Sequence, residues 1–217
     1  MGPLQSQKFT FINVIAVCGI SIFLLSSCSR TEVVETPPIP IIRDGGALSG
    51  DPCGAPCFWE ITPGITTKDQ VIAILKDRGV YQDCEFFDYS QRGGDYGIDC
   101  QPGISISFKQ NTEIVIHLGF EPDQNIMISE IIAKYGNPDG VLVVPQGIPE
   151  APPHVSMIIY FDKINTSIIL PGQDSAVYEL SPRSHITLIG YFVQTEYESN
   201  RRDAASWHGY GTYDYNR

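Results

Sequence analysis

Ile104-Ser-Ile-Ser-Phe-Lys109 alternates apolar and polar side chains without a break. Successive side chains of a strand point to opposite faces of its sheet, so this alternation predicts a strand with one buried face. Further strand-like runs surround it, at 81–89, 96–100, 113–120, 141–145, 155–162, 166–170, 177–180 and 185–194. The chain is therefore predicted to be built around a sheet.

Two segments show helical spacing instead. Residues 68–78 repeat apolar side chains every three to four positions, between Thr66-Thr67 as a cap and Gly79 as a stop signal. Residues 126–135 carry a second apolar stripe that ends at Gly136-Asn-Pro. This order of helix, strands, helix and strands predicts an α+β domain, an antiparallel sheet with two helices packed on one face. Two tandem helix-plus-sheet modules are an alternative that the low identity between the halves leaves open.

The composition limits what the chain can bind. It has 217 residues, of which 42% are hydrophobic, enough to bury the core of one ordinary domain. The formal net charge is −11. Because phosphate binding needs clustered Lys and Arg, this charge argues against a nucleic-acid partner, and it also argues against electrostatic docking on an anionic bilayer.

The N-terminus has the pattern of an export signal. Lys8 precedes residues 9–25, which are almost purely apolar. The residues that follow, Leu25-Ser-Ser-Cys28, resemble the lipobox of bacterial lipoproteins, in which an aliphatic residue and two small residues precede a cysteine. In that family the cysteine receives a diacylglyceryl thioether and becomes the first residue after cleavage.

This resemblance implies both a modification and a location. Residues 1–27 would be a cleaved signal peptide, and acyl chains such as palmitate on Cys28 would anchor the protein in membrane lipid. The protein would then lie in the cell envelope, on the extracytoplasmic face of a bacterial membrane. An uncleaved transmembrane anchor is the alternative, because the 17 residues from 9 to 25 are near the shortest length that spans a bilayer.

Residues 28–50 are expected to form a lipidated tether. The prolines at 37, 38 and 40 favour an extended chain, and the glycines near residue 50 favour flexibility. From Cys28 onward the chain carries a net charge of −12, so an anionic membrane surface should repel the domain. The alternative is that Val33-Val34 or Ile41-Ile42 pack on the body.

Four cysteines follow Cys28, and an even number in an exported chain predicts disulfides. They are Cys53, Cys57, Cys84 and Cys100. Zinc binding by these four and a redox role for Cys53-x-x-x-Cys57 are alternatives, but the spacing fits neither a zinc knuckle nor C-x-x-C. We therefore expect no metal and no cofactor.

A hairpin argument selects the pairing of the cysteines. If Gly93-Gly94 forms a hairpin turn, the flanking strands pair with Cys84 opposite Cys100. The same register sets Phe86 opposite Ile98, so the apolar pair shares a face with the sulfur atoms, as a half-buried hairpin requires. This predicts one bridge between the two strands and leaves the other two cysteines to close a small ring.

Residues suited to catalysis are scarce. The histidines are His117, His154, His185 and His208. His117 lies in an apolar run and is interpreted as a buried strand residue, and the motifs H-E-x-x-H, G-x-S-x-G and S-x-x-K are absent. The acidic residues between 83 and 99 lack the spacing of a calcium-binding loop and are interpreted as solvated strand faces. The sequence therefore assigns no catalytic residue.

Two phrases of the body resemble a known group of proteins. Pro63-Gly-Ile-Thr-Thr…Ile74-Leu75 resembles the opening helix of the SmpA/OmlA-type outer-membrane-assembly lipoproteins. Ile131-Ile-Ala-Lys-Tyr-Gly-Asn-Pro138 resembles the helix end that precedes the sheet in such modules. These lipoproteins share an α/β module with the β-lactamase-inhibitor-protein fold, which carries two modules in tandem. The resemblance implies a binding or scaffold role without catalysis.

The expected organisation ends with a globular domain at 51–195 and a tail at 196–217. The tail is first charged and then rich in Gly and aromatic residues, and Trp207 and its neighbouring Tyr rings are expected to dock on the sheet, with a free partner-binding tail as the alternative. We interpret the protein as a membrane-anchored envelope lipoprotein that acts as a non-catalytic binding or scaffold module for an envelope protein. The alternatives are an envelope hydrolase with a scattered His/Asp site and an inhibitor-like module for an envelope enzyme.

Overall fold

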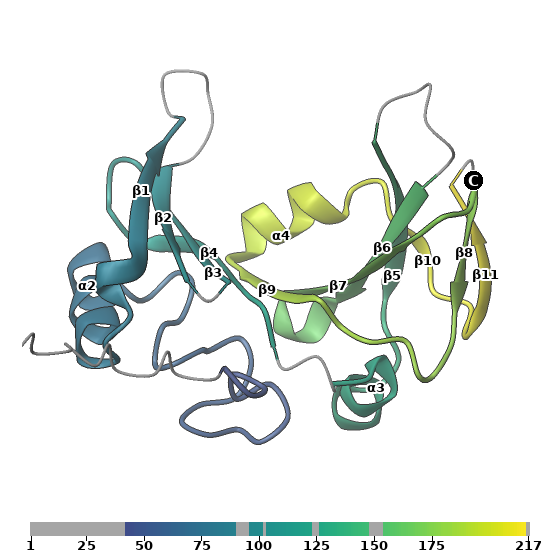
Figure 1. Ribbon diagram of the computed structural model, residues 1–217, viewed down its shortest axis with the longest axis horizontal. Coiled ribbons are helices and arrows are strands. Elements are labelled where there is room, and N and C mark those ends of the chain that lie inside the picture. The colour runs from purple at the N-terminus through teal and green to yellow at the C-terminus, as the bar shows by residue number, and fades with distance from the viewer. Residues whose placement is uncertain (1–41, 90–95, 102, 123–125, 148–153, 216–217) are drawn as a thin grey trace, which may run out of the picture. The chain divides into compact units, whose positions relative to one another are not determined.

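The computed structural model describes residues 42–89, 96–101, 103–122, 126–147 and 154–215 (Figure 1). Within these residues, nine strands form one sheet with antiparallel pairing throughout, in the order β1-β2-β3-β4-β9-β7-β6-β5-β10. Their bounds are Cys84–Asp88 (β1), Tyr96–Cys100 (β2), Ile104–Phe108 (β3), Val115–Phe120 (β4), Gly140–Gln146 (β5), His154–Phe161 (β6), Thr166–Gln173 (β7), Leu188–Phe192 (β9) and Ala205–Ser206 (β10). Strand β8 (Val177–Leu180) pairs separately with β11 (Gly211–Asp214). The prediction of an antiparallel sheet in an α+β fold is confirmed.

Three α-helices accompany the sheet in the described residues: α2 (Lys68–Asp77), α3 (Ile128–Tyr135) and α4 (Gln194–Arg201). Helix α2 begins with a capping box, in which the Thr67 side chain accepts from the Gln70 backbone and the Gln70 side chain accepts from the Thr67 backbone. Helix α3 ends at Gly136, whose φ of 90° is a conformation that favours glycine. Both helices lie where the apolar spacing predicted them.

The order of elements repeats along the chain. Helix α2 precedes β1 to β4, which pair consecutively, and helix α3 precedes β5, β6, β7 and β9. The two sets meet where β4 pairs with β9, so they form one continuous sheet. This is the order of elements that two tandem helix-plus-sheet modules require.

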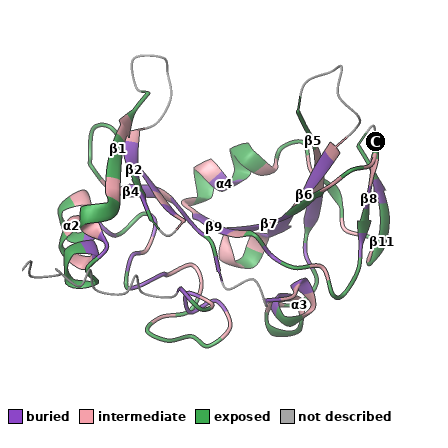
Figure 2. Cartoon of the chain, viewed as in Figure 1, coloured by how far each residue is buried: buried purple, intermediate pink, exposed green. Residues whose placement is uncertain are grey.

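One face of the sheet carries the core. A row of fully buried side chains crosses four neighbouring strands on this face: Ile98, Ile106, Leu118 and Tyr191. Val71 and Leu75 of α2 and Ile128 and Ile131 of α3 belong to the same buried cluster. Figure 2 shows the central strands coloured largely as buried. Apolar burial of this kind stabilises a fold by roughly 25 cal/mol for each Å² removed from water.

The third helix departs from the expected arrangement. Helix α4 lies on the opposite side of the sheet from α3 (Figure 1). Its buried residue Tyr197 packs against Tyr160 and Phe192, with ring centroids 6.0 Å and 6.4 Å away. The expectation of two helices on one face therefore missed a third helix, and the three helices do not all pack on one face. Residues 196–202 were expected to begin a tail because they are highly charged. The helix buries only Tyr197, so the sequence shows no apolar stripe that would predict it.

The C-terminal residues join the fold. Strand β10 pairs with β5 and β11 pairs with β8. Tyr213 is buried and Trp207 is half-buried, with their ring centroids 6.3 Å apart. Trp207 and Tyr213 thus pack in the fold, whereas Tyr210 and Tyr215 are exposed, and β11 adds to β8 rather than to the main sheet.

The described chain begins inside the body. Ile42 and Ala47 are buried, and the Asp44 carboxylate accepts from the backbone N–H groups of Gly46 and Leu48 at 3.2 Å and 2.9 Å. Gly45 has a φ of 57° and lies so close to Phe120 that a β-carbon there would overlap its ring. The expectation of a free tether over residues 28–50 is therefore wrong for residues 42–50. The alternative, in which Ile41-Ile42 pack on the body, holds for Ile42. The signal peptide, Cys28 and the rest of the tether lie outside the described residues.

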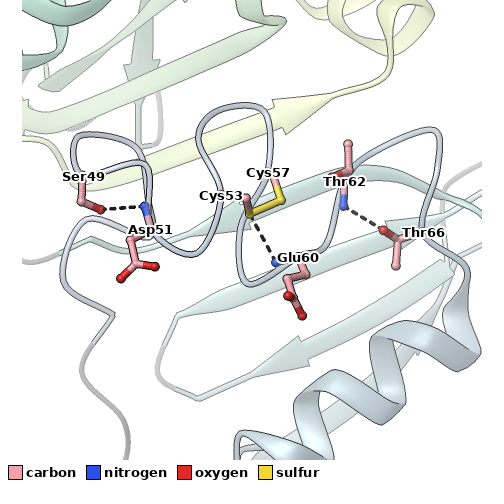
Figure 3. The surroundings of a disulfide bond; sticks show 7 residues. All are labelled: Ser49, Asp51, Cys53, Cys57, Glu60, Thr62 and Thr66. Atoms are coloured by element: carbon pink, nitrogen blue, oxygen red, sulfur yellow. Dashed lines mark hydrogen bonds between the residues drawn. A yellow bond between two sulfur atoms is a disulfide. The ribbon is translucent and has the colours of Figure 1, made fainter.

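Two cysteine pairs lie at disulfide distance, Cys84–Cys100 and Cys53–Cys57. Strands β1 and β2 pair in the predicted register, with Phe86 opposite Ile98, although the Gly93-Gly94 turn lies outside the described residues. Figure 3 shows the smaller ring, where the Glu60 backbone N–H donates to Cys53 Sγ at 3.4 Å. Because the four sulfur atoms are paired, they do not form the alternative zinc site.

The two bridges should differ in their contribution to stability. The Cys84–Cys100 bridge joins residues 16 apart and Cys53–Cys57 joins residues 4 apart. In the chain-entropy model, replacing both cysteines of the longer loop by Ala lowers the free energy of unfolding by about 3 kcal/mol, against about 2 kcal/mol for the shorter loop. Urea unfolding of the two double variants measures this difference, and a larger loss from the Cys53–Cys57 pair would contradict it.

Candidate binding groove on the open face of the sheet

The face of the sheet opposite the core carries a row of small residues. The cross-strand neighbours in this row are Ser105 (β3), Gly119 (β4), Gly190 (β9) and Ser167 (β7). Tyr160 of β6 continues the row on one side and Asp99 of β2 on the other. Because four adjacent strands place a glycine or serine here, the middle of this face is hollowed.

A groove of about 390 Å³ lies over this row. Its lining comes from β3, β4, β6, β7, β9 and α4: Ser105, Ile116, His117, Gly119, Ile158, Tyr160, Ser167, Ile169, Leu188, Phe192, Glu196 and Asn200. Ile158, Ile169 and Leu188 are half-buried cross-strand neighbours that form an apolar wall. A second hollow of about 320 Å³, which includes Lys109, shares Ile116 and Glu196 with the first. The two hollows therefore meet at the start of α4.

Helix α4 is fastened over one side of the groove. The Tyr197 hydroxyl donates to Asp162 Oδ1 at 2.7 Å, and Arg201 Nε lies 2.8 Å from the same oxygen. The Tyr160 hydroxyl donates to the Asn200 carbonyl at 2.9 Å, and burial raises the pKa of Tyr160 to about 12. These contacts hold the helix against the sheet, so Glu196 and Asn200 form a fixed rim.

Gly119 leaves space that packing does not require. A β-carbon at this position would meet nothing closer than the His117 ring at 3.5 Å, which is an ordinary contact. At Gly190, by contrast, a β-carbon would lie 3.0 Å from Phe192 and Ser167 atoms, so close packing explains that glycine. Glycine weakens the interior of a strand and often marks a point where another molecule approaches the backbone. Gly119 therefore keeps the floor of the groove open at some cost to the strand.

His117 is the titratable residue most altered by the groove. Its ring stacks on Phe192 with centroids 4.5 Å apart, and burial lowers its pKa to about 4, so the imidazole is neutral near pH 7. Among the described residues, no side chain hydrogen-bonds to this ring, although Glu196 lines the same groove. A neutral imidazole offers one donor and one acceptor. The groove thus suits a ligand with an apolar body and a polar group near His117.

The structure does not bring the residues singled out in the sequence together. The four paired cysteines lie outside the groove lining. His154 also lies outside it, with Nδ1 2.7 Å from Asp174 Oδ1. His208 stacks on Tyr213 at the C-terminal end, with ring centroids 4.0 Å apart. Of the four histidines, only His117 contributes to the groove. The sequence analysis did not identify the glycines of the groove or helix α4. An isolated glycine in a strand pattern, such as Gly119, can nevertheless indicate a close approach to the backbone.

In the described part of the chain, no group of three or more His, Cys, Asp or Glu side chains is placed to hold a metal ion. Nor does that part contain a helix with the length and apolar character needed to span a membrane.

The lowered pKa of His117 predicts a pH dependence of stability. Above its ordinary value of 6.5 the ring is neutral in folded and unfolded chains alike. As the pH falls from 6.5 toward 4, the unfolded chain binds a proton that the folded chain does not, so this residue lowers the free energy of unfolding by up to about 3 kcal/mol. The stability associated with the neutral His117 ring is therefore fully present above pH 6.5 and is lost as the pH falls toward 4.

The matched variant is His117→Gln, which cannot titrate. Urea unfolding of both proteins near pH 7.5 and near pH 4.5 should show the original chain losing about 2–3 kcal/mol more than the variant. An equal loss in the two proteins would mean that His117 is protonated as readily in the folded as in the unfolded chain.

Comparison with known proteins gives no family assignment: no family model, no curated protein and no solved structure matches this chain. The resemblances to the lipobox and to the outer-membrane-assembly lipoproteins stay predictions from the sequence.

Proposed function

We propose that the protein is a lipid-anchored binding module of the bacterial cell envelope, which holds its partner in the groove over Gly119. The observation that carries this proposal is the groove itself, with an open glycine floor, an aliphatic wall and a neutral histidine. Such a mostly apolar concavity with few polar groups is typical of binding sites. The lipobox at Cys28 and the paired cysteines support an oxidising location outside the cytosol.

The hydrolase alternative has one observation in its favour. His117 and Glu196 line the same groove, which is the kind of His and acidic pair that such an enzyme needs. A general base must also be oriented by a hydrogen-bonded partner, and none of the described side chains bonds to the His117 ring. Binding therefore remains the proposal that this arrangement supports best.

The inhibitor-like alternative has weaker support. That role favours an exposed sheet face rich in Tyr, whereas this face is partly covered by α4. The one tyrosine lining the groove, Tyr160, is buried, and the apolar wall is aliphatic. The partner is therefore proposed to insert an apolar group into the groove.

Lipid attachment is tested at Cys28. We expect the protein purified from membranes of its own producing cells to lack residues 1–27 and to carry the mass of added acyl chains. The Cys28→Ser variant should lose these chains and leave the membrane fraction, because the acidic domain has no electrostatic attraction to replace them. Intact-mass analysis decides the point, and a native product that begins at Met1 without added mass would overturn the anchoring.

The groove is tested by filling it. Gly119→Leu should place its side chain in the hollow and abolish partner binding while leaving the fold intact, since a β-carbon fits there. Ala73→Leu introduces the same side chain on the exposed side of α2 and serves as the control. Site-specific photo-crosslinking from position 169 in intact cells should give an adduct in the control and none with Gly119→Leu.

The outcomes separate the alternatives. An adduct of equal yield in both variants would exclude the groove as the binding site. A hydrolytic activity that His117→Gln abolishes while adduct formation persists would favour the hydrolase alternative.

A further inference from the structure

We propose that the outer edge of β1 is a second binding site, which takes an extended basic segment of another protein as an added strand. This goes beyond the groove and does not depend on it. Within the described residues, β1 pairs with β2 on one side and with no strand on the other. Figure 2 shows β1 exposed or intermediate along its length, in contrast to β2 beside it.

The backbone register determines which groups face outward. The Gln101 N–H donates to the Asp83 carbonyl at 3.1 Å, one step before the first paired residues Cys84 and Cys100, so position 83 faces β2. Hydrogen-bonded pairs alternate in an antiparallel ladder, so Glu85 and Phe87 bond to β2. The N–H and C=O of Phe86 therefore point away from the sheet, toward the position of an added strand.

Several of the usual protections of an edge strand are missing from β1. Exposed edges are normally blunted by charged side chains, above all lysine, and by proline, a bulge or a very short strand. The charged side chains of β1 are the carboxylates of Glu85 and Asp88, which disfavour an acidic partner and not a basic one. Residues 84–89 contain neither proline nor lysine, and all five residues of β1 pair with β2 without a register shift. At the opposite edge of the sheet, β10 has only two residues. The Cys84–Cys100 bridge fixes β1 to β2, so this edge is held ready for pairing.

Exposed aromatic rings lie along the same edge. Phe86 is 54% exposed, and Tyr89, just after the end of β1, is 57% exposed. Phe86 and Phe87 are successive residues of the strand and point to opposite faces of the sheet. The Phe87 ring stacks near Tyr89, with centroids 5.7 Å apart. An added strand would thus find an apolar contact on each of its faces.

The charges at this edge select a basic partner. Glu85 and Asp99 are exposed cross-strand neighbours, and like charges directly opposite each other are unfavourable. Neither carboxylate has an ion-pair partner among the described residues. A Lys or Arg on the added strand next to Glu85 would relieve this repulsion. A second copy of the chain, with a net charge of −11, would increase it.

The first test measures amide exchange at Phe86. The probe is the peptide acetyl-Lys-Val-Lys-Val-Lys-Val-amide, with the Glu-Val peptide of the same length as control. At saturation the basic peptide should slow exchange of the Phe86 N–H by at least about tenfold and leave the already bonded Glu85 N–H unchanged. No protection, equal binding of both peptides, or a Phe86 N–H that is protected before peptide is added would overturn the proposal.

Two variants of Phe86 distinguish the contribution of its backbone N–H to peptide binding from that of its side chain. Phe86→Ala keeps the outward N–H and should weaken peptide binding by about threefold. Phe86→Pro removes that donor and should weaken it by about tenfold or more, while the Cys84–Cys100 bridge still forms, since proline is tolerated on an edge. Equal effects of the two variants would exclude strand addition.

Two further variants test the charge and the location. Glu85→Lys should reverse the preference, so that the Glu-Val peptide binds more tightly. Gly119→Leu should leave peptide binding unchanged, and a loss there would assign the peptide to the groove instead. Dimerisation of the protein alone that Phe86→Pro abolishes would show a second copy as the occupant and overturn the choice of a basic partner.

Discussion

The pairing of β4 with β9 is the interaction on which the remaining structure depends. It joins the strands that follow α2 to those that follow α3, so that two short sheets become one. Along this junction the pairs alternate. Leu118 with Tyr191 fills the core, whereas Gly119 with Gly190 lies on the open face. A single ladder therefore creates both the centre of the core and the floor of the groove, because successive residues of a strand face opposite ways.

Local features of this fold could be predicted from the sequence, and the junction could not. The alternation at 104–109 and the helical spacing at 68–78 depend on neighbouring residues, and the cysteines added one constraint that set the register of β1 and β2. Nothing local specifies that His117 pairs with Phe192, because β4 and β9 lie far apart in the sequence and neither a hairpin turn nor a disulfide joins them. The groove follows from this distant pairing, so its residues were missed with it. Helix α4 was not predicted, because its single buried residue, Tyr197, does not give the sequence a helical spacing of apolar residues.

Three features proposed for binding carry a cost to the isolated chain. Gly119 weakens a central strand, the buried His117 lowers the free energy of unfolding below pH 6.5, and within the described residues β1 has no strand on its outer side. Two of these costs are offset nearby: the Leu118 and Tyr191 contact lies beneath Gly119, and a disulfide secures β1. Stability and binding thus occupy opposite faces of the same sheet. This separation allows the open face to change with little effect on the core.

The groove and the β1 edge lie on one continuous row of the sheet. Glu85, Asp99, Ser105 and Gly119 are successive cross-strand neighbours, so three strand spacings, about 14 Å, separate the edge from the groove floor. A strand added at β1 would direct alternate side chains toward the same face as the groove. One partner with a basic extended segment and an apolar projection could then occupy both sites, and its affinity would exceed that of either contact because the second would form intramolecularly. The acidic charge, which is expected to repel an anionic membrane surface, would at the same time attract such a partner, so one property of the composition would serve both the proposed location and the proposed recognition.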